Sequence, residues 1–131
     1  PVLSVHEAEA MTAMVNRVHA APEVCDYLVR IVGATRQLAD VRLPVSPRGS
    51  VSLLRAARSR ALTLGRPFVT PDDVKSLVAP VLAHRLLLSP DALLSGATPE
   101  SVLERAVAAI AVPHRPGAQT SGSMSGSTSR A

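Results

Sequence analysis

Apolar residues recur every three or four positions in four stretches of the chain, a spacing that places them on one face of an α-helix. The four predicted faces are Val24, Leu28, Ile31, Thr35 and Leu38; Val51, Leu54, Ala57, Ala61 and Leu64; Val74, Leu77, Val78, Val81 and Leu82; and Val102, Leu103, Ala106, Val107 and Ile110. We therefore expect these helices to bury their faces in one common core.

Helix starts are marked by proline preceded by a residue that suits an N-cap. A serine or threonine can cap the first turn, and proline fits the first helical position because it has no N–H to lose. This pattern occurs at Ser46-Pro47, Thr70-Pro71, Ser89-Pro90 and Thr98-Pro99. Pro22 indicates another start, and Ser4 with Glu7 has the spacing of a capping box. The sequence predicts five helices and a short turn at Pro90–Leu94.

The remaining segments add little regular structure. Residues 41–45 and 67–69 look extended but are too short for more than a minor two-strand contact. Residues 116–131 are rich in Gly, Ser and Thr without an apolar period, so we expect a disordered tail. The fold class predicted is all-α, a small helical bundle over residues 21–115, preceded by a separate helix within residues 1–20.

Composition supports helices and leaves the partner open. Hydrophobic residues make up 47% of the 131, but only one Tyr and one Phe are present, which favours packed helices over sheets. Lys and Arg total 14 against 10 acids, and Lys75 is the only lysine. The arginine excess fits either a negatively charged partner or a solvated basic surface.

Several kinds of active site are not supported by the sequence. No glycine-rich phosphate loop is present, and Lys75 follows Asp72-Asp73 at a predicted helix start, where the two acids complement the helix dipole. The histidines and the lone Cys25 are too widely spaced to suggest a metal site. A single cysteine allows no internal disulfide, and with no long apolar run we expect a cytoplasmic protein without a membrane segment.

Ser46-Pro47-Arg48 is the most informative short motif. It places an arginine in the first turn of a long helix, where a positive charge opposes the helix dipole. A bound anion would remove the conflict, because the guanidinium and the helix end would then contact the same phosphate. An ordinary exposed arginine is the alternative.

Four blocks in order resemble the lid domain of MoxR-family AAA+ ATPases. They are residues 27–36 (YLVRIVGATR), 46–49 (SPRG), 65–75 (GRPFVTPDDVK) and 81–85 (VLAHR), and the resemblance extends over about residues 2–113. It implies that Arg48 is sensor 2, in contact with the terminal phosphate of ATP. It also implies that ATP and Mg²⁺ are bound only jointly with a separate AAA+ core, to which residues 1–20 would be the linking helix.

Two features qualify the resemblance. Pro44-Val45 stand where the family commonly has Gly-Ala, and a proline there would stiffen the approach to Arg48. Arg36 belongs to one of the family blocks and is a second candidate for contact with the nucleotide. We expect instead a salt bridge inside the lid for Arg36, because helix arginines commonly pair locally.

The resemblance also implies a function for the whole protein. MoxR proteins act as chaperone-like ATPases in rings, which we expect to be hexameric in this case, often alongside von Willebrand factor A proteins. This chain would contribute a lid that transmits the nucleotide state to neighbouring subunits. Alone it should not hydrolyse ATP, because the catalytic core is absent from it.

A histone-fold-like module for nucleic-acid binding or dimerisation is the alternative. A long helix from Pro47 to Leu64, followed by a helix at Thr70-Pro71, would suit that fold, and the arginine excess would suit DNA. The scarcity of aromatic residues and the upstream helices argue against it, so nucleic acid is not the partner we favour.

Overall fold

The computed structural model describes residues 2–113, so the predicted tail at 116–131 lies outside the described residues. The described part contains six α-helices: α1 (Val5–Arg17), α2 (Pro22–Ala34), α3 (Pro47–Thr63), α4 (Pro71–Leu82), α5 (Pro90–Leu94) and α6 (Pro99–Ala109). Two 3₁₀ turns, η1 (Thr35–Gln37) and η2 (Ala83–Arg85), and two short strands, β1 (Val41–Leu43) and β2 (Leu87–Leu88), connect them. The all-α prediction is confirmed, and α5 is the predicted short turn.

The helices begin where the proline pattern predicts. Proline is the first residue of every helix except α1. The Ser4–Glu7 capping box is present at α1, and a similar reciprocal pair forms at the start of α4 between Thr70 and Asp73. Ser46 is the exception, because its side chain makes no cap hydrogen bond with α3. Local sequence therefore determines where the helices start. It does not predict that the first N–H groups of α3 receive no hydrogen bond from the Ser46 side chain.

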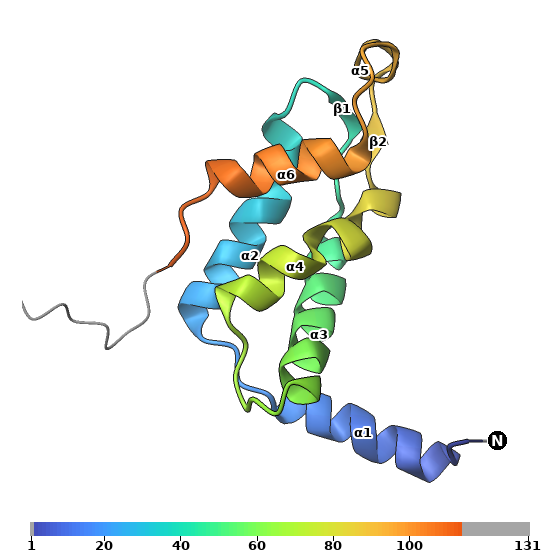
Figure 1. The fold of residues 1–131 in the computed structure, drawn as a ribbon, viewed down its shortest axis with the longest axis vertical. Helices are drawn as coiled ribbons and strands as arrows, with labels where there is room; N and C mark the ends of the chain where they lie inside the picture. The colour runs from blue at the N-terminus through green and yellow to red at the C-terminus, as the bar shows by residue number, and fades with distance from the viewer. Residues whose placement is uncertain (1, 114–131) are drawn as a thin grey trace, which may run out of the picture.

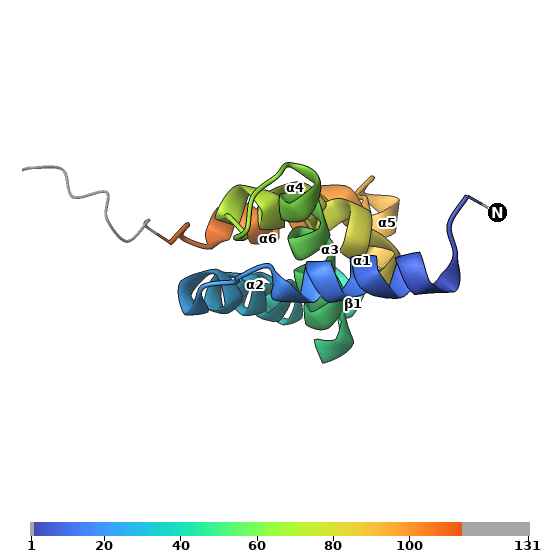
Figure 2. The same cartoon turned by 90° about the horizontal axis from the view of Figure 1, so that it is seen from below.

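The core lies between α2, α3, α4 and α6, which pack around one set of buried side chains (Figure 1). Its largest fully buried residues include Tyr27, Ile31, Leu53, Leu82 and Leu103. α1 is different: none of its residues is buried, and it runs away from the bundle towards the N-terminus, as Figure 2 also shows. Within residues 2–113 no helix is both long and apolar enough to cross a membrane.

The buried face of α3 differs from the predicted one. Val51 and Leu64 were expected in the core but are 52% and 56% exposed. The buried residues are Gly49, Leu53, Ala57 and Ala61, which follow one another at intervals of four positions on one side of the helix. Residues with small side chains at three of these four positions let α4 approach α3 closely. The predicted face correctly included Ala57 and Ala61, but it missed Leu53 and Gly49, because its spacing was counted from Val51 and Leu54.

The extended segments were located correctly, but only one of them lies in the sheet. β1 pairs with β2 in antiparallel orientation, with an irregularity between the Val41–Leu88 and Leu43–Leu87 pairs. Residues 67–69, the other extended segment, instead form backbone hydrogen bonds with the link between α1 and α2. The His19 N–H donates to the carbonyl oxygen of Pro67 at 2.9 Å, and the Val69 N–H donates to the carbonyl oxygen of His19 at 2.8 Å.

Candidate functional site

Arg48 is the second residue of α3 and is exposed to solvent. In the described part of the chain it makes no ion pair within 4.0 Å. The first turn of α3 carries no acid and no side-chain cap, whereas the first turns of the other five α-helices each carry at least one Asp or Glu. The positive end of the helix dipole and a guanidinium therefore lie together, with no acid in the first turn and no ion pair among the described residues to offset them.

The segment leading to Arg48 is anchored in the core. Val45 is fully buried, and its N–H donates to the Thr35 hydroxyl oxygen at 3.4 Å. Pro44 is exposed, so the departure from the family's Gly-Ala places a ring at the surface and a branched apolar side chain in the core. The approach to Arg48 is thus held by Val45 on the inside, rather than by Pro44 alone.

Arg36, the second candidate, lies in η1 directly after Thr35 and is exposed. The predicted salt bridge is wrong: among residues 2–113, Arg36 has no acidic partner within 4.0 Å. Its helical turn ends at Gln37, and Asp40, the one acid within a turn of it in sequence, pairs with Arg105 instead. The Thr35–Val45 contact places the segment carrying Arg36 beside the segment that leads to Arg48.

Asp73 has a larger structural role than the predicted first-turn acid. It is 1% exposed and accepts two hydrogen bonds from the Arg66 guanidinium, at 2.7 and 2.6 Å, and one from the Thr70 N–H at 2.8 Å. Burial alone would raise the pKa of Asp73, but the hydrogen bonds from Arg66 and Thr70 outweigh it and lower the pKa to about 2. The pair joins the loop after α3 to the start of α4. The block GRPFVTPDD (residues 65–73) therefore has a structural role, because its Arg66 and Asp73 hold these two segments together.

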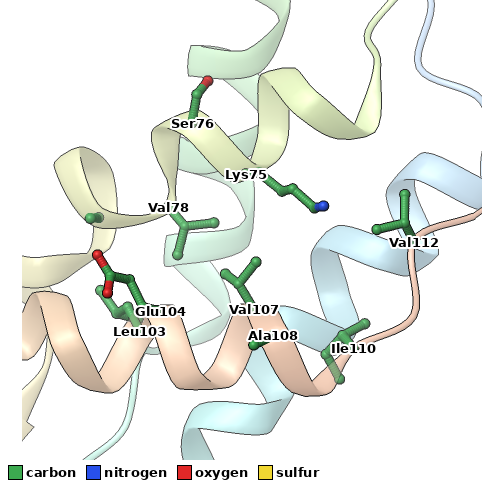
Figure 3. A pocket seen from close by; sticks show the side chains of 10 residues that line it. Lys75, Ser76, Val78, Leu103, Glu104, Val107, Ala108, Ile110 and Val112 are labelled. Carbon is green, nitrogen blue, oxygen red and sulfur yellow. The ribbon is translucent and has the colours of Figure 1, made fainter.

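One described cavity does not include Arg48. It is a groove of about 470 Å³ between α4 and α6, with an apolar floor that includes Val78, Leu103 and Val107 (Figure 3). Lys75 and Glu104 lie on its two sides, on different helices. None of its lining residues belongs to η1, to β1 or to the start of α3. No lining residue therefore connects this groove with the arginine that the sequence singles out.

Comparison with known proteins gives a consistent family. A family model described as an AAA lid domain matches residues 33–106, a range that includes both Arg36 and Arg48. The chain is 37% identical over 113 residues to the uncharacterized protein YeaC of Bacillus subtilis, covering 86% of this chain and 35% of that protein. It is 43% identical over 107 residues to Chaperone MoxR1 of Mycobacterium tuberculosis, covering 75% of this chain and 28% of that protein. It thus spans about a third of the length of these relatives.

The fold also matches a solved structure. A crystal structure of a candidate ATPase from Cytophaga hutchinsonii superimposes with a TM-score of 0.73 at 22% identity, covering 78% of this chain and 34% of the other. At this identity the likeness shows the fold alone. Together with the family match and the packing of α2 on α3 and α4, it favours the lid over the histone-fold-like alternative.

Proposed function

The chain belongs to the AAA lid domain family, and on this premise we propose that it closes over ATP held by a separate AAA+ core, with Arg48 as sensor 2. The observation that carries the proposal is the start of α3. An exposed guanidinium and an uncapped helix N-terminus without an acid lie together there, and both favour an anion. A phosphate oxygen of bound ATP would satisfy both groups at once.

In this proposal the lid and the core have different tasks. Within residues 2–113 no three His, Cys, Asp or Glu side chains are close enough to hold a metal ion. The proposal places the Mg²⁺ ligands and the phosphate loop in the core, so that ATP and Mg²⁺ bind jointly with it. Arg48 would add a charge-assisted hydrogen bond to the terminal phosphate when the lid closes.

Closure would have a mechanical result. The terminal phosphate attracts Arg48, and its loss on hydrolysis removes that attraction, so the angle of the lid would follow the nucleotide. In a ring, hexameric in our proposal, this motion would pass to the neighbouring subunit and drive chaperone-like remodelling of protein complexes. The similarity to Chaperone MoxR1 supports this class of activity, and von Willebrand factor A proteins and a cytoplasmic location remain part of the proposal.

The test is turnover by the ATPase that joins this lid to its core. A charge-assisted hydrogen bond contributes roughly 1.5–3 kcal/mol, so Arg48→Ala should slow hydrolysis about tenfold to over a hundredfold if the contact acts fully in the transition state. Arg48→Lys should restore only part of the rate, because a point charge lacks the bidentate fork.

Arg55 supplies a matched control for this test. It is an exposed arginine on the same helix, two turns or about 10 Å from Arg48, and makes no ion pair among the described residues. Arg55→Ala should leave turnover unchanged. Equal losses in Arg48→Ala and Arg55→Ala would indicate a general effect of positive charge on α3 and would contradict the sensor assignment.

A further inference from the structure

We propose that Thr35 is a positioning residue for Arg48, acting through Val45 and Gly49. The inference rests on the proposed role of Arg48 and adds the part of the lid that fixes the position of its backbone. Thr35 is fully buried at the junction of α2 and η1, thirteen positions before Arg48. It is a polar residue on an otherwise apolar helix face, so its hydroxyl needs partners inside the core.

The Thr35 hydroxyl joins two segments of the chain. It donates to the Val32 carbonyl oxygen at 2.6 Å and accepts the Val45 N–H at 3.4 Å. The second contact is at the long end of the hydrogen-bond range, but Val45 is fully buried, and no carbonyl oxygen in the described part of the chain accepts its N–H. Removal of the hydroxyl would leave a buried amide without a partner, which favours movement of the segment towards water.

Val45 is also locked against the first turn of α3. An added Cβ at Gly49 would lie 2.2 Å from Cγ1 of Val45 and 3.3 Å from Cδ2 of Leu82. The valine side chain thus occupies the space that any larger residue at position 49 would need. Gly49 is itself buried, so its contact with Val45 fixes the helix start from the side of the core.

These contacts enclose Arg48 on both sides in sequence. Val45 and Gly49 are buried anchors, and only Ser46, Pro47 and Arg48 lie between them. Pro47 has a fixed φ angle, which further reduces the freedom of this short segment. The backbone of Arg48 is therefore held before any nucleotide binds, as a residue that must meet a phosphate within a few tenths of an ångström requires.

The experiment uses the ATPase that contains this lid and its core. Thr35→Val keeps the shape and removes the hydroxyl, and we expect turnover to fall about tenfold with ADP affinity unchanged, since ADP lacks the phosphate that Arg48 would contact. Thr35→Ser keeps the hydroxyl and should recover most of the rate. The matched control is Thr63→Val at the other end of α3, where the hydroxyl donates to the Ser59 carbonyl oxygen at 2.8 Å; it should leave turnover unchanged.

A double variant separates positioning from a structural role. If Thr35 acts through Arg48, adding Thr35→Val to Arg48→Ala should cost no further turnover. A further loss of the same size in that background, or normal turnover in Thr35→Val alone, would overturn the inference. Normal turnover in Arg48→Ala would instead overturn the proposed function, so the two failures are distinguishable.

A second variant covers the case in which Thr35→Val does not fold. Val45→Ala keeps the backbone amide and the Thr35 hydroxyl but removes the side chain that locks against Gly49. It should give the same selective loss of turnover, again absent in the Arg48→Ala background. Normal turnover in Val45→Ala would overturn the inference independently.

Discussion

Replacing Asp73 with asparagine should weaken the fold in a way that depends on pH. An asparagine at this position would keep the size of the side chain but could not carry the negative charge that faces Arg66. In the native chain the Asp73 carboxylate is almost completely buried and also lies 3.3 Å from Nε of Arg60. The variant would therefore leave at least one guanidinium without its counter-charge at the junction of α3 and α4.

The size of the effect follows from the pKa of Asp73. Its value falls from an ordinary 3.8 to about 2 in the folded chain, a difference that corresponds to about 2.5 kcal/mol of stability. Because the folded-state pKa is lowered, this contribution is present above about pH 5 and is lost as the pH falls through 4 towards 2. The Arg66 side chain is 27% exposed and can be rehydrated, so Asp73→Asn should cost about 2–3 kcal/mol at pH 7, below the cost for a fully buried pair.

Urea unfolding of the native chain and the variant at several pH values between 7 and 2.5 measures this effect. The part of the difference in free energy of unfolding that comes from the pKa shift should shrink steadily below about pH 5, to about a third of its value at pH 7 by pH 2.5. Asp72→Asn is the matched control: Asp72 lies in the same first turn but is exposed, so its loss should cost only the roughly 0.3–1 kcal/mol typical of a dipole contact. A difference for Asp73→Asn that stays constant across the pH range would refute the reasoning.

Three further predictions concern packing, surface charge and activity. Gly49→Ala should lower the free energy of unfolding by about 1–3 kcal/mol, because the added methyl group clashes with Val45. Val45→Ala should relieve part of that loss when the two changes are combined, and denaturant titration of both single variants and the double variant measures this. Arg105→Ala should cost less than about 1 kcal/mol in the same assay, because its salt bridge with Asp40 is largely exposed. The isolated chain should show no ATP hydrolysis above background in a phosphate-release assay; turnover by a pure sample would contradict the division of labour with the core.

Local chemistry made the family and the helix boundaries predictable. The lid resemblance drawn from four sequence blocks is confirmed by the family match, and the helix starts at Pro22, Pro47, Pro71 and Pro99 are where the sequence indicated. Proline and its capping neighbour act within a few residues, so their effect can be predicted without knowledge of the fold. The two-residue strand β2 could not be predicted in this way, because only its pairing with β1 defines it.

The surroundings of the candidate site depended on contacts between distant residues. Thr35 was included in an apolar stripe, and a threonine at a core position was the available signal that its hydroxyl has a buried partner. That partner, Val45, is ten positions away and could not be identified from periodicity. For Arg36 the local-pairing rule failed because its helical turn ends at Gln37 and the nearby acid Asp40 pairs with the distant Arg105. The sequence was enough to single out Arg48 as a candidate, but only the structure shows that Val45 and Gly49 hold the backbone on either side of it.

Nucleotide discrimination by the lid-containing ATPase tests the central claim most directly. The affinities for ADP and for a non-hydrolysable ATP analogue would be measured for the native protein, Arg48→Ala and Arg55→Ala. If Arg48 contacts the terminal phosphate, Arg48→Ala should lose about tenfold or more in affinity for the ATP analogue while binding ADP almost normally, and Arg55→Ala should match the native protein. Equal losses for both nucleotides in Arg48→Ala, or no loss for either, would contradict the assignment of Arg48 as the residue that senses ATP.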